Sequence, residues 1–200
     1  MDEITAQQEI AFIKKIMTDS RRIVYKDGTE LIFWGIIVVI GLVITYFSII
    51  AKYFSIFTWL WPSIIILGWL VSFIMGKRRS KKLATKTFAG KLLSVVWVSC
   101  GIAMAIIGFA GSISGALQGF SVSPAISIIL GIGFAITGFI YGKKWISALS
   151  IGWWLGSLIM FFWPGLYTLL FFAAMMFLFQ VVPGIIIYNK SKKEITGTVQ

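Results

Sequence analysis

The chain has 200 residues, of which 58% are hydrophobic and only 12% are charged. Soluble domains carry charge on about a quarter of their residues, so this composition excludes an ordinary soluble protein and indicates an integral membrane protein. The chain has no histidine and a single cysteine, Cys100. Because transition-metal sites depend on these side chains, we expect no metal and no other cofactor.

Residues 1–30 form a charged leader ahead of the first apolar stretch. Apolar side chains recur in it at roughly helical spacing, at Ile4, Ile10, Ile13, Met17 and Val24. We therefore expect an amphipathic helix that lies on the membrane surface. The leader holds six of the seven acidic residues, whereas residues 77–91 hold seven basic residues and no acidic one. This charge split suggests the hypothesis that the leader docks on the 77–91 loop.

Six long apolar stretches follow the leader, and none contains Asp, Glu, His, Lys or Arg. They are Leu31–Ile50, Phe54–Met75, Leu92–Ala110, Pro124–Tyr141, Trp145–Phe162 and Gly165–Tyr188. A membrane-spanning helix needs about 20 apolar residues. We predict an all-α fold, a bundle of six transmembrane helices over residues 31–188, followed by a basic tail over residues 189–200. Only a short turn separates the fourth and fifth spans, which must form a tight hairpin.

The basic residues predict the orientation of the bundle. If the six spans alternate in direction, all of the 18 basic residues except Lys52 fall on one side of the membrane. Loops on the cytoplasmic side carry the excess of Lys and Arg. We therefore expect both termini on the cytoplasmic side of the membrane.

The spans also suggest a repeated hairpin, in which spans one and two, three and four, and five and six pair. The second span ends in FIMGKR at residues 73–78, and the fourth ends in FIYGKK at residues 139–144. The first, third and fifth spans carry tryptophan at Trp34, Trp97 and Trp153-Trp154. Either the chain contains three degenerate repeats, or apolar spans with basic ends resemble one another by chance.

Small residues recur every four positions on the fourth and fifth spans. Such a pattern lets helix backbones approach closely in lipid. Packing within one chain is the favoured interpretation, and an oligomer or a partner helix is the alternative. The candidate packing residues are Gly131, Gly138, Gly142, Ala148, Gly152 and Gly156. In the last span, Pro183 removes a backbone hydrogen bond and predicts a kink.

Three tryptophans, Trp69, Trp153 and Trp154, fall near the middle of their spans, away from the interfaces where tryptophan usually lies. They either line a pocket for an apolar ligand or fill the core of the bundle against the glycines. Filling of the core is the favoured interpretation.

The basic loop after the second span is the strongest surface feature of the sequence. Its residues either reflect membrane topology alone or also bind anionic lipid headgroups or the leader. No aromatic residue that could stack on bases is interleaved with the basic residues of segment 77–82, so nucleic acid is not an expected partner. The candidate residues are Lys77, Arg78, Arg79, Lys81 and Lys82.

The order of these features resembles a family of small, uncharacterised bacterial six-span membrane proteins. The resemblance rests on the stretch IFWGIIVVIGLVITYF at residues 32–47, the stop FIMGKRR at residues 73–79 and the ending VVPGIIIYNKSKK at residues 181–193. Members of that family are often thought of as companions of small transcriptional regulators. The resemblance implies a six-helix membrane bundle, and it implies no activity and no binding residues.

Two classes of function fit the sequence. The first is a non-catalytic membrane module that binds a partner or acts as a regulator or sensor. The second is a permease or channel for a neutral or apolar solute, because the spans carry no carboxylate or histidine that could couple transport to ions. No nucleophile in the spans has a base to activate it, so we do not expect an enzyme.

Overall fold

The computed structural model of the chain describes residues 28–82, 88–117 and 119–197, apart from the side chains of residues 79–82 and 194–197. Every regular element in this part of the chain is helical. The elements are α2 (Thr29–Ile50), α3 (Ile56–Lys82), α4 (Phe88–Ala105), η1 (Ile106–Gly111), η2 (Gly119–Ser121), α5 (Val122–Tyr141), α6 (Lys144–Phe162), α7 (Tyr167–Met176), η3 (Phe177–Val181) and α8 (Val182–Gly197). The predicted leader helix falls on residues that are not described.

Within the described residues, six helical segments are long and apolar enough to cross a membrane. The third of them is α4 continued by the π-helical η1, and the fourth is η2 continued by α5. The sixth, here called the last span, runs through α7, the π-helical η3 and α8 from Tyr167 to Lys193. The predicted all-α bundle of six spans is therefore confirmed.

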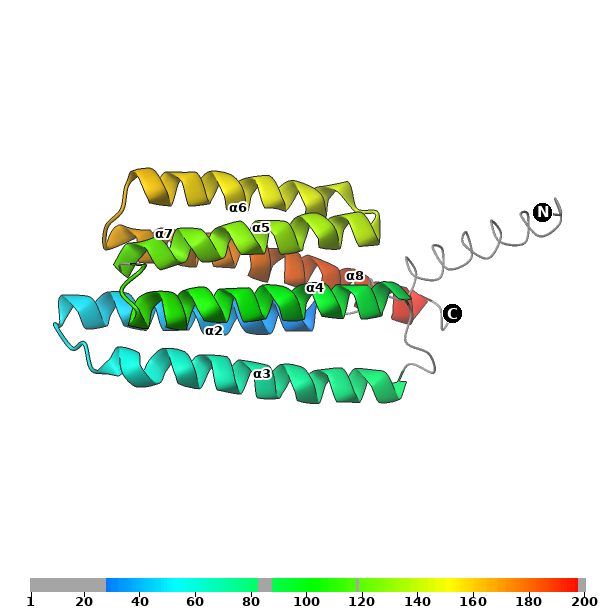
Figure 1. Cartoon of the computed structure of the whole chain (residues 1–200). Helices are drawn as coiled ribbons and strands as arrows, with labels where there is room; N and C mark the ends of the chain where they lie inside the picture. The colour runs from blue at the N-terminus through cyan, green and yellow to red at the C-terminus, as the bar shows by residue number, and fades with distance from the viewer. Residues whose placement is uncertain (1–27, 83–87, 118, 198–200) are drawn as a thin grey trace, which may run out of the picture.

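The six spans lie side by side, and consecutive spans run in opposite directions (Figure 1). The start of α2 and the ends of α3 and α8 lie at one end of the bundle, together with the α5–α6 turn (Figure 1). We call this the basic end, because the described basic residues other than Lys52 belong to it. Lys52 lies in the α2–α3 connection at the opposite end. This arrangement agrees with the charge asymmetry seen in the sequence.

The pairing of helices differs from the three hairpins that the sequence suggests. The most extensive packing joins α5 to α6, and the next joins α2 to the last span, which lies far from it in the sequence. By contrast, α6 packs only lightly against the last span. The reason is close approach: the backbones of Gly28 and Gly184 meet where α2 crosses the last span, and Gly35 faces Val181. No side chain at these glycines holds the two helices apart.

The turn between α5 and α6 is the tight connection that the sequence predicts. Gly142 ends α5 in the left-handed region at φ 62°, and its N–H donates to the carbonyl oxygens of Gly138 and Phe139. A residue with a Cβ is strained in this conformation, which glycine adopts freely. Gly142 thus acts as a turn residue and not as a residue of a helix-packing stripe.

Pro183 lies two residues after the π-helical segment η3, which ends at Val181 in the last span. Because proline has no N–H and its ring crowds the preceding turn, a regular α-helix cannot continue through it without loss of a hydrogen bond. A π-helical turn is wider than an α-helical one and is often found at irregular points of long helices. The last span is thus irregular just before Pro183, and the kink predicted at Pro183 stays a prediction.

The left-handed conformation at Gly142 can be tested against a glycine that lacks it. We expect Gly142→Ala to destabilise the bundle by about 1–2 kcal/mol, the cost of placing a Cβ in this region. The matched control is Gly76→Ala, because Gly76 lies within α3 and an added Cβ there would meet no atom within 4 Å. Thermal unfolding in one detergent measures both variants, and equal losses of stability would contradict the role of Gly142.

Candidate functional site

The centre of the bundle is an aromatic cluster built around Trp153 on α6. This side chain is 0% exposed. Its ring centroid lies 5.9 Å from that of Phe134 on α5, 6.1 Å from Phe172 on α7 and 5.8 Å from Phe179 on η3. Phe134 in turn packs edge-on against Trp97 at 5.7 Å. Three spans, α5, α6 and the last span, therefore meet at Trp153, and α4 joins the cluster through Trp97.

Glycines on α6 make room for this cluster. An added Cβ at Gly152 would lie 2.8 Å from the ring of Phe179, and one at Gly156 would collide with Met175. Aromatic and long side chains of the last span can therefore lie directly on the α6 backbone. This packing supplies the dispersion contacts that hold helices together in lipid, where burial of apolar surface adds little.

The first two hairpins share a second arrangement, here called the indole clasp. In α2 and α3, the Trp34 ring lies on Gly68, and its Nε1 donates to Ser72 Oγ at 2.8 Å. In α4 and α5, the Trp97 ring lies on Gly133, and its Nε1 donates to an oxygen of the next turn, Thr137 Oγ1, at 3.1 Å. In both hairpins the glycine precedes the hydroxyl residue by four positions.

The clasp favours true repetition of the first two hairpins over chance similarity. Each clasp needs a tryptophan on one helix and a glycine and a hydroxyl, one turn apart, on the next. The fifth and last spans do not repeat it. There the Trp154 indole packs back onto Gly131 of α5 and donates to the carbonyl oxygen of Ile128 at 3.3 Å.

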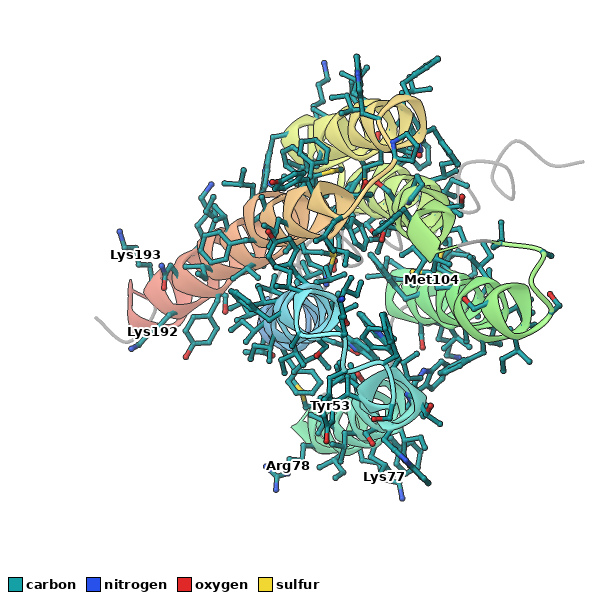
Figure 2. All side chains as sticks on the ribbon, turned by 90° about the vertical axis from the view of Figure 1, so that its left-hand side faces the viewer. Tyr53, Lys77, Arg78, Met104, Lys192 and Lys193 are labelled. Atoms are coloured by element: carbon teal, nitrogen blue, oxygen red, sulfur yellow. The ribbon has the colours of Figure 1, made fainter. Side chains whose placement is uncertain are left out.

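The three tryptophans proposed as a pocket or core do not converge. Trp69 lies on α3 and Trp153 on α6, at opposite sides of the bundle (Figures 1 and 2). Trp69 packs near Gly101 of α4, and both Trp69 and Trp154 are 40% exposed. Only Trp153 belongs to the centre, where it is packed as a core residue.

Some of the predicted packing residues lie at helix contacts and one of them is exposed. Gly131, Gly138, Gly152 and Gly156 all face a side chain or backbone of a neighbouring helix; at Gly138 the neighbour is Ser147. Ala148, which continues the α6 stripe in the sequence, is exposed. The reason is that α6 rests on other helices at Gly152 and Gly156, while the turn of α6 nearer the basic end presents Ala148 outward.

Two buried hydroxyl groups donate to carbonyl oxygens of a neighbouring helix, across the α5–α6 contact. Ser127 Oγ donates to the Trp153 carbonyl at 2.8 Å, and Ser157 Oγ donates to the Pro124 carbonyl at 2.9 Å. These bonds fasten α5 to α6 at two levels. Because an unpaired polar group is costly in hydrocarbon, they also fix the register of the two helices.

Two buried polar atoms among the described residues have no hydrogen-bond partner, Trp153 Nε1 and Gln180 Oε1. Gln180 is 4% exposed and lies in η3, in the middle of the last span. Sequence reasoning missed this residue. The available signal was that Gln180 is the one amide side chain in the apolar run 165–188.

The described side chains of the basic end lie on its rim. Lys77 and Arg78 of α3 and Lys192 and Lys193 of α8 point away from the bundle, on different sides of it (Figure 2). Lys77 Nζ lies 4.5 Å from the ring centroid of its neighbour on the same helix, Phe73. The predicted residues Arg79, Lys81 and Lys82 have side chains outside the described set. The rim therefore spreads positive charge around the membrane surface and does not concentrate it in a pocket.

Among the described residues, no three His, Cys, Asp or Glu side chains come together as a metal site would require. The chemistry available to the centre is that of apolar and aromatic packing, hydroxyl groups already bonded to carbonyls, and one amide.

Removal of the central ring should be far more damaging than removal of a lipid-facing one. We expect Trp153→Ala to cost about 3–5 kcal/mol, because the surrounding rings cannot close the cavity left by a buried aromatic residue. The control is Trp59→Ala, since Trp59 is 76% exposed. Unfolding in mixed micelles measures both, and a loss for Trp153→Ala no larger than that of the control would contradict a structural centre.

Comparison of the chain with protein-family models, with curated proteins and with solved structures gives no match. The resemblance to small bacterial six-span proteins therefore stays a prediction, and the proposals below rest on the residues of this chain.

Proposed function

We propose that this protein is a non-catalytic module of the bacterial cytoplasmic membrane that binds a partner membrane protein and regulates it or senses through it. The observation that carries the proposal is the uneven packing of the bundle. In α3 and in the α4–η1 span, 6% of the positions in the most apolar stretch are buried, against 50% in the η2–α5 span and the last span. The α3 and α4–η1 spans thus present helix surface, and the η2–α5 span and the last span supply most of the core.

The outer helices each rest on few neighbours. Apart from weak contacts, α3 packs only on α2, and α4 packs on η1, its own continuation, and on α5. Figure 2 shows α3 and α4 at the edge of the bundle beside the central α2. Surfaces of this kind suit a partner helix in the membrane, because helix pairs in lipid are held by van der Waals packing along exposed faces.

The centre of the bundle favours this proposal over a permease. A solute path for a neutral molecule needs an interior that can open and hold the solute. Here the fully buried Trp153 packs against rings from α5 and the last span, which leave no room beside it. The buried hydroxyls of Ser127 and Ser157 are engaged with backbone carbonyls and do not line a path.

We further propose that the basic end faces the cytoplasm and contacts anionic lipid headgroups. Its rim carries the exposed residues Lys77, Arg78, Lys190 and Lys193, whereas the opposite end carries Lys52. Basic residues at an anionic surface each contribute about 1 kcal/mol of attraction, and the cytoplasmic side is where they accumulate. Leader docking on the 77–91 loop lies outside the described residues and stays a prediction.

The partner surface can be mapped by photo-cross-linking in the native membrane. A photoreactive amino acid at Leu67 of α3 or Val95 of α4, which are 59% and 62% exposed, should give an adduct of one defined mass. The matched control is Leu155 of α6, which is 55% exposed. Adducts at Leu155 alone, or none at any position, would contradict a partner on the α3–α4 side.

Lipid contact can be measured separately by native mass spectrometry of the purified protein with mixed anionic and zwitterionic lipids. We expect Lys77→Gln with Arg78→Gln to reduce the number of retained anionic lipids. Retention of zwitterionic lipids should stay unchanged, because the effect is electrostatic. The control is Lys52→Gln at the opposite end, and an equal effect of the control would contradict a specific role of the basic rim.

A further inference from the structure

The two unpaired polar atoms in the centre are a donor and an acceptor. Trp153 Nε1 can only donate a hydrogen bond, and Gln180 Oε1 can only accept one. Both residues lie near the middle of their spans, Lys144–Phe162 and Tyr167–Lys193. Burial of either group without a partner is unfavourable in an apolar interior, so a bond between them would remove both costs.

The residue that packs on Trp153 is the one directly before Gln180 in the sequence. Phe179, the preceding residue, lies on Gly152 and has its ring centroid 5.8 Å from that of Trp153. Gln180 itself faces α2, where its Cγ would lie 3.6 Å from a Cβ added at Gly35. The stem of the Gln180 side chain therefore lies against α2, and the position beside the indole is taken by Phe179.

Phe179 and Gln180 both belong to the π-helical segment η3, which spans Phe177–Val181. A π-helical segment inserted in an α-helix contains one residue more than the α-helical path through the same length. The π-helical turn can move by one turn toward α7. Each residue that it passes then shifts by one position and takes the place that the preceding residue held. That change rotates the passed residues by about 100°, the angle per residue of an α-helix.

We propose that the last span has two registers and that this shift exchanges them. In the first register, which the structure shows, Phe179 lies on Gly152 and Gln180 faces α2. In the second, Gln180 takes the place of Phe179 and its Oε1 accepts a hydrogen bond from Trp153 Nε1. The first register has the better ring packing, and the second satisfies both polar groups. The gain in packing and the gain in hydrogen bonding oppose each other and keep the two registers close in free energy.

The position of Pro183 makes this segment the natural place for such a shift. Pro183 offers no N–H to the carbonyl oxygens of the turn before it, so the helix there has one bond fewer to break. The helix α2 packs along α7, η3 and α8 alike. A change of register in η3 would therefore rotate the part of the last span toward α7 against α2. This inference goes beyond the proposed function and does not depend on it.

The test observes the indole N–H groups by NMR in detergent micelles, with ¹⁵N-labelled tryptophan. Trp153→Phe assigns the Trp153 signal. We expect that signal to show exchange broadening in relaxation-dispersion measurements, which detect microsecond-to-millisecond motion. Gln180→Leu should abolish the broadening, because it keeps the volume of the side chain and removes the acceptor. The Trp97 indole, which already donates to Thr137, is the internal control and should stay sharp throughout.

A second variant allows the proposed hydrogen bond to Trp153 Nε1 to form in the first register, with no change of register. Exchanging the two residues, with Phe179→Gln and Gln180→Phe, places the amide on Gly152 in the first register. We expect the Trp153 indole proton to move downfield and to exchange with solvent deuterium at least tenfold more slowly than in the unmodified chain. A Trp153 signal free of exchange broadening in the unmodified chain, or broadening that persists in Gln180→Leu, would overturn the two-register proposal.

Discussion

The structure depends on direct contact between aromatic rings and glycine. In lipid, burial of apolar surface between helices adds little, so association rests on close packing and on satisfied polar groups. This chain achieves both with large rings that contact the backbone at glycine. Trp34 on Gly68, Trp97 on Gly133, Trp154 on Gly131 and Phe179 on Gly152 are four cases from different helix pairs.

The indole N–H fixes the position of the ring along the neighbouring helix. A ring on a glycine could slide along the helix axis, but a hydrogen bond from Nε1 to an oxygen of the next helix holds it at one level. Ser72 and Thr137 serve this purpose in the first two hairpins, and the Ile128 carbonyl serves it for Trp154. The one central indole without such an acceptor is that of Trp153. The packing there is dense, while the polar contacts are incomplete.

The same contacts explain why the two halves of the bundle differ. Around Trp153 the ring contacts join α5, α6 and the last span, so these three spans form a core with α2 beside it. In α3 and α4 each helix has one clasp and large apolar side chains elsewhere, such as Ile66 and Val95. A bundle of this kind has a firm centre, which suits a scaffold, and helices at its edge, which suit contact with other membrane components.

The sequence by itself determined the number of apolar spans, their approximate positions and the α5–α6 turn. These follow from local physics: about 20 consecutive apolar residues cross the hydrocarbon, and a glycine before two lysines ends a span sharply. It also pointed to the repeated hairpin through Trp34 and Trp97, because the features of a repeat lie at similar spacings along the chain.

Only the tertiary structure decided which helices pair and which residues form the centre. Apolar spans look alike in sequence, so the contact of α2 with the last span could not be read from Gly28, Gly35 and Gly184 alone. For the same reason Ala148 and Gly152 seemed equivalent, although one is exposed and the other receives a ring. The roles of Trp153 and Gln180 depend on what lies opposite them across the bundle, and that is set by long-range packing and not by local sequence.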